Sequence, residues 1–112
     1  MDNHPPTTEL HISDGGLWAV RSTSNTVCYL DLDHMLLLRD RGPGSPRFPY
    51  DGQWVPLVQV RSPLGDFGVV RVGHRHEFLT DPGGGLQDYQ WWIPRVCIAI
   101  SPVDPADAPP GR

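Results

Sequence analysis

The chain has 112 residues, enough for one small domain, and its 13 prolines and 12 glycines disfavour long helices and favour short strands joined by turns. The formal net charge of −4 argues against a dedicated nucleic-acid binder, because neutralisation of phosphates by basic residues supplies most non-specific affinity. No stretch approaches the roughly 18 apolar residues of a membrane span, and the first residues, MDNHPPTTEL, carry neither the basic nor the apolar region of a secretory signal, so we expect a cytoplasmic chain.

Both ends of the chain are polar and contain several prolines. Residues 1–12 and residues 101–112 (SPVDPADAPPGR) carry too few apolar side chains to offset the entropy lost on ordering. We therefore predict a disordered tail at 1–12, a single β domain at 13–100 and a disordered, proline-rich tail at 101–112.

The predicted elements of the domain are seven short strands. In chain order they are LWAVRST (17–23), TVCYLDLD (26–33), HMLLLRD (34–40), WVPLVQVRS (54–62), DFGVVRV (66–72), HEFLT (76–80) and YQWWIPRVCIAI (89–100). Their β-branched and aromatic residues favour strands, and a long loop with three prolines fills residues 40–53. Short strands at regular spacing predict an all-β fold, a small antiparallel sandwich or barrel.

Alternation along two of these strands predicts which side chains face the core, because residues two positions apart share a face. The expected core side chains are Cys28, Leu30, Leu32, Val96, Ile98 and Ile100. On the other side of the last strand, Cys97 and Ala99 are also small and apolar. The last strand is therefore expected in the middle of a sheet.

The segment at 69–85, VVRVGHRHEFLTDPGGG, holds two histidines one residue apart. Gly68, His74 and His76 resemble the first half of the metal-binding motif of cupins, β-barrels that hold a metal with histidines and a glutamate. The glutamate of that motif is missing at its place, and no histidine follows His76. We favour a hairpin in which Gly73 and His74 form a two-residue turn, and we expect no cofactor.

Motifs for catalysis are missing from the sequence. There is no Gly-x-Ser-x-Gly elbow, no phosphate-binding glycine loop with lysine and no paired CxxC motif. Cys28 and Cys97 lie within apolar runs and are predicted to be buried, reduced thiols, although a bridge between them stays open. The sequence therefore favours a non-catalytic chain.

Aromatic side chains and arginines gather near loops and strand ends. Trp91 and Trp92 are adjacent, so they project to opposite faces of a strand and one of them can stay accessible. Exposed Trp and Tyr beside Arg are typical of interface hot spots, whereas a small core also needs large rings to fill it. The candidate interface residues are Trp91, Trp92, Tyr89, Arg41, Arg47, Phe48 and Tyr50.

A longer part of the chain, residues 17 to about 80, resembles small uncharacterised all-β proteins of actinobacteria and their phages. In that group a Trp-led strand precedes a Ser/Thr turn, an acidic strand, an arginine and an apolar strand after an Asp-Gly turn. The matching residues are Trp18, Ser22, Thr23, Tyr29, Asp31, Asp33, Arg39, Asp51-Gly52 and Val72-Gly73. The resemblance implies a small all-β protein and no particular activity.

Three functions are compatible with the sequence. The preferred one is a small β-module that binds another protein, such as an accessory or phage-encoded modulator of a host protein, through the candidate interface residues. The alternatives are a cupin-like metal-binding barrel or metal-dependent enzyme at His74 and His76, and a small-barrel nucleic-acid binder that uses the loop arginines. Contact with a membrane is not expected, and a homo-oligomer stays open.

Overall fold

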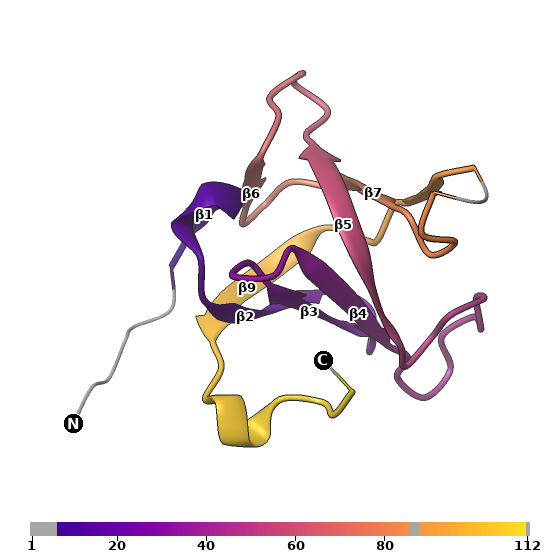
Figure 1. Ribbon diagram of the computed structural model, residues 1–112. Helices are drawn as coiled ribbons and strands as arrows, with labels where there is room; N and C mark the ends of the chain where they lie inside the picture. Colours follow the sequence, from indigo (N-terminus) through magenta and orange to yellow (C-terminus); the bar gives the residue numbers. More distant parts are fainter. Residues whose placement is uncertain (1–6, 86–87, 112) are drawn as a thin grey trace.

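The computed structural model describes residues 7–85 and 88–111, and this part of the chain is all-β (Figure 1). The strands are β1 (Glu9–His11), β2 (Leu17–Ser22), β3 (Val27–Asp31), β4 (Leu36–Asp40), β5 (Trp54–Arg61), β6 (Val69–Arg71), β7 (Glu77–Thr80), β8 (Gln90–Trp92) and β9 (Cys97–Pro102). Two short 3-10 helices, η1 (Ile12–Asp14) and η2 (Pro105–Asp107), complete the secondary structure. The predicted all-β class is confirmed. Among the described residues, no helix has the length and apolar character that a membrane span requires.

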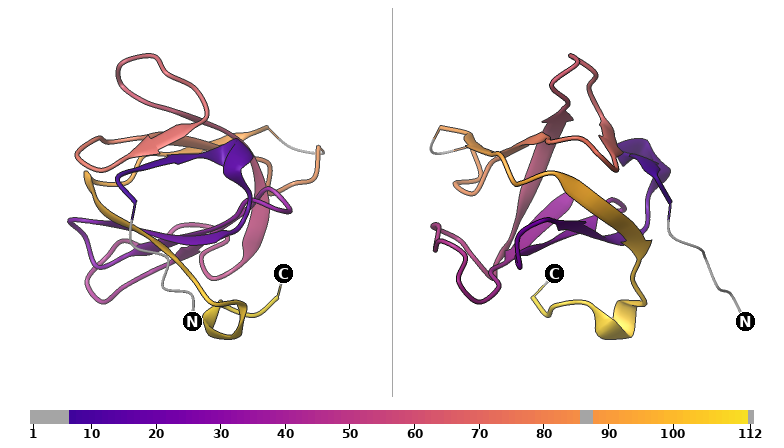
Figure 2. Two further views of the ribbon diagram at one scale, coloured as in Figure 1. Left: turned by 90° about the vertical axis from the view of Figure 1, so that its left-hand side faces the viewer. Right: turned by 180° about the vertical axis from the view of Figure 1, so that it is seen from behind.

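The strands form two antiparallel sheets. Seven strands pair in the order β8-β7-β5-β4-β3-β2-β9, and β1 pairs with β6. The residues just before β1 and β6 connect the small sheet to two strands of the large one: the Thr7 amide donates to the Ile100 carbonyl of β9 (3.0 Å), and the Gly68 amide donates to the Val60 carbonyl of β5 (2.9 Å). Figure 2 shows the strands running round one common interior.

Apolar side chains from both sheets fill this interior. Leu30, Val60, Phe78 and Ile100 are fully buried, and Leu10 of β1 joins the same cluster. The alternation predicted for the second strand is confirmed, since its three expected core residues are buried: Cys28, Leu30 and Leu32. Burial of this area is the main stabilising contribution to the fold.

The prediction of one continuous strand over residues 89–100 is wrong. The chain leaves β8 at Trp92 and enters β9 at Cys97, and these two strands lie at opposite ends of the large sheet. Pro94 lies in the connection, where its missing N–H breaks no ladder hydrogen bond. The predicted central position of this strand is therefore also wrong.

Two side chains of the segment 96–100 that were predicted to face the core lie outside the core. Val96 and Ile98 are 40% and 54% exposed, whereas Cys97 and Ile100 are buried. In the pairing of β2 with β9, Arg21 lies opposite Ala99 and Ser22 opposite Cys97, so Ile98 is an extra residue that forms a β-bulge in β9. A bulge changes the alternation by one residue, so the two-residue period fails across Ile98.

The N-terminal segment is ordered from Thr7 onward, which corrects the prediction of a disordered tail at 1–12; residues 1–6 lie outside the described part. Thr7 bridges to Ile100, and β1 follows. Leu10 is 1% exposed in the core. One apolar side chain and pairing with β6 thus hold a segment that its composition does not distinguish from a tail.

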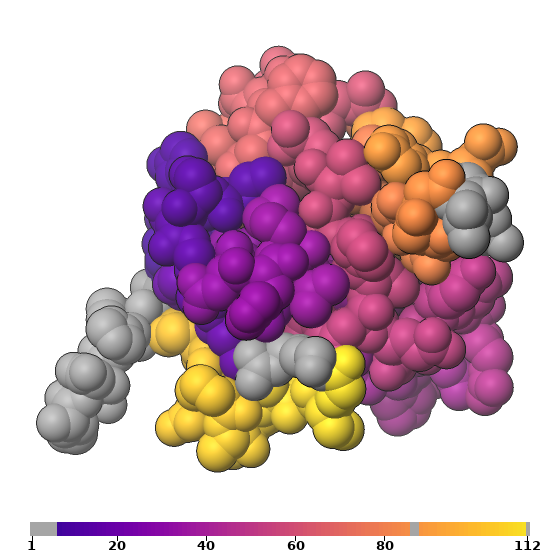
Figure 3. Space-filling model, viewed as in Figure 1, coloured from indigo at the N-terminus to yellow at the C-terminus, as the bar shows by residue number. Residues whose placement is uncertain are grey.

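The C-terminal segment 101–111 is also ordered, so the second predicted tail is wrong. Ser101 and Pro102 complete β9, and the Val103 amide then donates to the Leu17 carbonyl (2.9 Å). Beyond η2, the indole Nε1 of Trp54 donates to the Pro109 carbonyl (3.2 Å). The segment runs along the outer side of the large sheet, against the strands (Figures 1 and 3). Three side chains outside the main cluster are buried on these strands: Leu17, Ala19 and Leu38.

Candidate binding site

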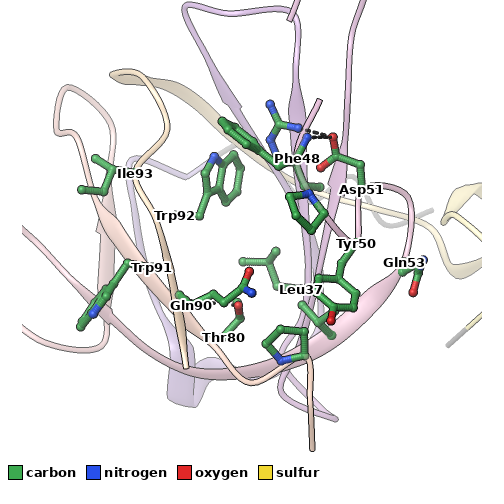
Figure 4. A pocket seen from close by; sticks show the side chains of 14 residues that line it. Leu37, Phe48, Tyr50, Asp51, Gln53, Thr80, Gln90, Trp91, Trp92 and Ile93 are labelled. Carbon is green, nitrogen blue, oxygen red and sulfur yellow. Dashed lines mark hydrogen bonds and ion pairs between the residues drawn. The ribbon is translucent and has the colours of Figure 1, made fainter. Parts of the chain in front are cut away.

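A pocket of about 240 Å³ opens between β8 and the loop that joins β4 to β5 (Figure 4). Leu37 and Val55, from the inner sides of β4 and β5, lie in its lining. The rest of the lining is dominated by large rings. We define the aromatic pocket by four of them: Phe48, Tyr50, Trp91 and Trp92.

A buried ion pair fixes the loop wall of the aromatic pocket. Arg39, on β4, donates from Nη1 to Oδ2 of Asp51 and from Nη2 to the Pro46 carbonyl (3.0 Å). The same Asp51 oxygen accepts the Phe48 amide hydrogen (2.9 Å). One side chain of β4 therefore holds both ends of the segment that carries the rings of Phe48 and Tyr50.

The guanidinium of Arg39 also lies between two of the rings. Its Cζ is 4.3 Å from the centre of the Phe48 ring and 5.5 Å from that of the Trp92 ring. Trp92 stacks in turn on Phe78 in the core, with ring centres 5.7 Å apart. The inner side of the aromatic pocket is thus continuous with the core.

Trp91 occupies the outer rim, and its ring points away from the ring of Trp92 (Figure 4). It is 48% exposed, and the guanidinium of Arg61 lies 4.8 Å from its centre. Arg61 is held by Glu77 across the sheet, with Nε to Oε2 at 2.7 Å. The ring is therefore accessible and restrained, two properties that favour a binding hot spot.

The structure brings together four of the seven sequence candidates. Tyr89 is 53% exposed and precedes β8, so it lies next to the site along the chain. Arg41 and Arg47 are exposed but do not line the aromatic pocket, and Arg41 donates to the Ser45 carbonyl of its own loop (2.9 Å). The basic loop residues are thus not part of the lining.

Sequence reasoning missed the ion pair of Arg39 and Asp51, which lie 12 residues apart in the chain. A signal for it exists: Arg39 is two residues after Leu37, so in a strand both must share a face. An inward-facing arginine needs a carboxylate partner, and the Asp-Gly turn at 51–52 supplies it.

His76 is buried and accepts a hydrogen bond at Nε2 from the Arg71 amide (3.0 Å). Burial, with smaller effects from the nearby charges of His74 and Arg71, lowers its pKa from 6.5 to about 4. The rings of His74 and His76 stack with centres 6.2 Å apart. Within residues 7–85 and 88–111, no group of three or more His, Cys, Asp or Glu side chains is placed to hold a metal.

The predicted hairpin at Gly73-His74 is wrong. β6 pairs with β1, whereas β7 pairs with β5 and β8. The turn between β6 and β7 is centred one residue earlier, on Val72 and Gly73, since the His74 amide donates to the Arg71 carbonyl (3.3 Å). Gly73 has a φ of +92°, which a glycine adopts without strain.

Cys28 and Cys97 are free, buried thiols, as predicted. Burial raises the pKa of both, so the thiol form persists at neutral pH. They therefore behave as small apolar side chains.

The chain matches no protein-family model, no curated protein and no solved structure. Its resemblance to actinobacterial and phage proteins stays a prediction.

Proposed function

We propose that this chain is a small non-catalytic module that binds an extended segment of another protein at β8 and the aromatic pocket. The observation that carries the proposal is the restrained, half-exposed ring of Trp91 at the rim of a pocket lined by Phe48, Tyr50 and Trp92. Rings held in place before binding lose little side-chain entropy when a partner covers them.

The position of β8 supports an extended partner. β8 is the end strand of the large sheet, and in the described part of the chain no strand pairs with its second edge. An added strand would place alternate side chains on the two faces of the sheet. The partner's side chains on one face would cover Trp91, and those on the other face would enter the aromatic pocket.

The lining suggests which partner side chains fit. The charges of Arg39 and Asp51 are paired with each other, and the rings present apolar surface. Aliphatic, aromatic or proline side chains therefore suit the aromatic pocket better than charged ones. We place the activity in the cytoplasm, a location that the two free thiols support, with a cellular protein as the partner.

The test uses a photo-crosslinking amino acid, benzoylphenylalanine, in place of Tyr89 at the rim of the site. We expect it to capture one defined protein from a lysate of the source organism, and a peptide of that protein should carry the crosslink. The matched control places the same group at Phe67, which is 60% exposed in the loop between β5 and β6.

When Trp91→Ala is added to the variant with benzoylphenylalanine at position 89, the crosslinked product should disappear. Equal products at both positions, or a product that persists without Trp91, would contradict the proposal.

A further inference from the structure

The C-terminal segment carries the geometry of a proline-rich ligand. Ala108 has φ −74° and ψ 149°, the values of a polyproline II helix. Two prolines follow, whose rings fix φ close to the same value. Ala108 therefore has polyproline II geometry, and the two prolines that follow it share its φ.

This stretch contacts a tryptophan, a residue type that lines the grooves in which proline-rich ligands bind. Trp54 Nε1 donates to the Pro109 carbonyl (3.2 Å), and a Cβ built on Gly111 would lie 3.8 Å from the Trp54 ring. A polyproline II backbone makes no internal hydrogen bonds, so its carbonyls are free to accept from an indole.

Trp54 and the aromatic pocket belong to opposite faces of the sheet. Val55 lines the aromatic pocket, and Trp54, one residue earlier in β5, projects to the other side. Leu36, His34 and Asp31 border the C-terminal segment there. The two surfaces are therefore independent of each other.

The C-terminal segment lies at the surface, against the ends of β3 and β4. η2 contains no buried residue, and a space of about 650 Å³ remains between the segment and the ends of β3 and β4. Its contacts with the sheet include the hydrogen bond from the Val103 amide to the Leu17 carbonyl, at the exit of β9, and that from the indole of Trp54 to the Pro109 carbonyl. Such a segment opens at a lower cost in free energy than a strand of the core.

We propose that Trp54 and the adjoining outer face of β4 form a second binding site, whose ligand is a polyproline II segment of a partner protein. The ligand has a small residue followed by two prolines, and residues 108–110 occupy the site in cis. A tethered occupant acts at an effective concentration in the millimolar range. A partner segment must therefore compete with it.

The experiment follows the Trp54 indole N–H by NMR in the full chain, with Pro109→Ala/Pro110→Ala to weaken the cis occupant. We expect the indole signal to shift and to lose protection from solvent exchange. The peptide VDPADAPPG should then bind saturably and return the signal to its wild-type position. Its apparent Kd should be at least tenfold lower than in the wild-type chain, where the cis occupant competes.

Two controls separate a binding site from simple packing. The same peptide with both consecutive prolines replaced by Ala should not bind, and Trp54→Phe, which keeps a ring but removes the N–H, should weaken binding at least fivefold. Titration of the wild-type chain needs no substitution and should show the same selectivity at higher peptide concentration.

An indole signal that stays unchanged in the double variant, or equal binding of both peptides, would overturn the proposal. So would a wild-type dimer that forms by exchange of C-terminal segments and disappears in Trp54→Phe, since the occupant would then be a second copy.

Discussion

Arg39 and Asp51 form a buried ion pair in the wall of the aromatic pocket, with side chains that are 9% and 13% exposed. The Nε of Arg39 and the Oδ1 of Asp51 are buried and have no hydrogen-bond partner. The desolvation of this ion pair is therefore only partly compensated.

Asp51→Ala should lower the free energy of unfolding by about 3 kcal/mol, because it leaves the Arg39 charge buried without a carboxylate. Arg39→Met/Asp51→Leu should recover most of that loss, because it removes both charges. Urea unfolding at neutral pH measures both. Glu77→Ala is the matched control, since the exposed pair of Glu77 and Arg61 should be worth less than about 1 kcal/mol. A loss for Asp51→Ala no larger than for Glu77→Ala would be incompatible with a buried pair.

Ile100→Ala should destabilise the chain by about 2–5 kcal/mol, whereas Ile98→Ala should cost less than about 1 kcal/mol. Ile100 is fully buried, and Ile98 is 54% exposed because the bulge turns it outward. Equilibrium unfolding of the two variants gives the comparison. Similar losses at both positions would mean that β9 alternates regularly and has no bulge.

The sequence predicted the regular parts of this fold and missed the parts that depend on a distant partner. Alternation placed Cys28, Leu30 and Leu32 correctly, because β3 pairs without interruption on both sides. It failed at Ile98, because a bulge arises from the register with β2, which lies far away in the chain. The C-terminal segment was missed because its partner, the outer face of the large sheet, exists only after the strands pair.

The candidate site, too, could be predicted from the sequence only in part. Phe48, Tyr50, Trp91 and Trp92 could be selected from composition, because large rings near strand ends remain close to the surface. The role of Arg39 depends on its pairing with Asp51, 12 residues further along the chain, which alternation within one strand does not predict. This pairing makes Arg39 the residue that fixes the loop.

The free energy of unfolding should fall as the pH is lowered from about 6.5 to about 4, by at most about 3 kcal/mol. The folded protein keeps His76 neutral because its pKa is lowered to about 4, whereas the unfolded chain takes up a proton near pH 6.5. The stabilisation is thus complete above pH 6.5 and is lost toward pH 4. Urea unfolding at a series of pH values measures it, and the lowered pKa values of Glu9 and Glu77 contribute only below about pH 4.5.

His76→Gln, which can still accept the Arg71 amide hydrogen, should remove most of this pH dependence. His74→Gln should retain it. An identical pH profile for wild type and His76→Gln would show that His76 is not the responsible group.

Neither cysteine should react with a thiol reagent in the folded protein, and both should react in urea. The thiolate is the reactive form, and burial raises the pKa of Cys28 and Cys97. A colorimetric thiol assay with and without urea measures the difference. Rapid labelling of either thiol under native conditions would show that these strands open readily.

The most direct measurement of the central claim is the dissociation constant for the partner peptide identified by the Tyr89 crosslink. Phe48→Ala and Trp91→Ala should each weaken binding at least tenfold, about 1.4 kcal/mol, because they remove the rings on the two faces of β8. Phe67→Ala, an exposed ring outside the site, should change the constant less than twofold. If all three variants bind like the wild type, the aromatic pocket is not the binding surface.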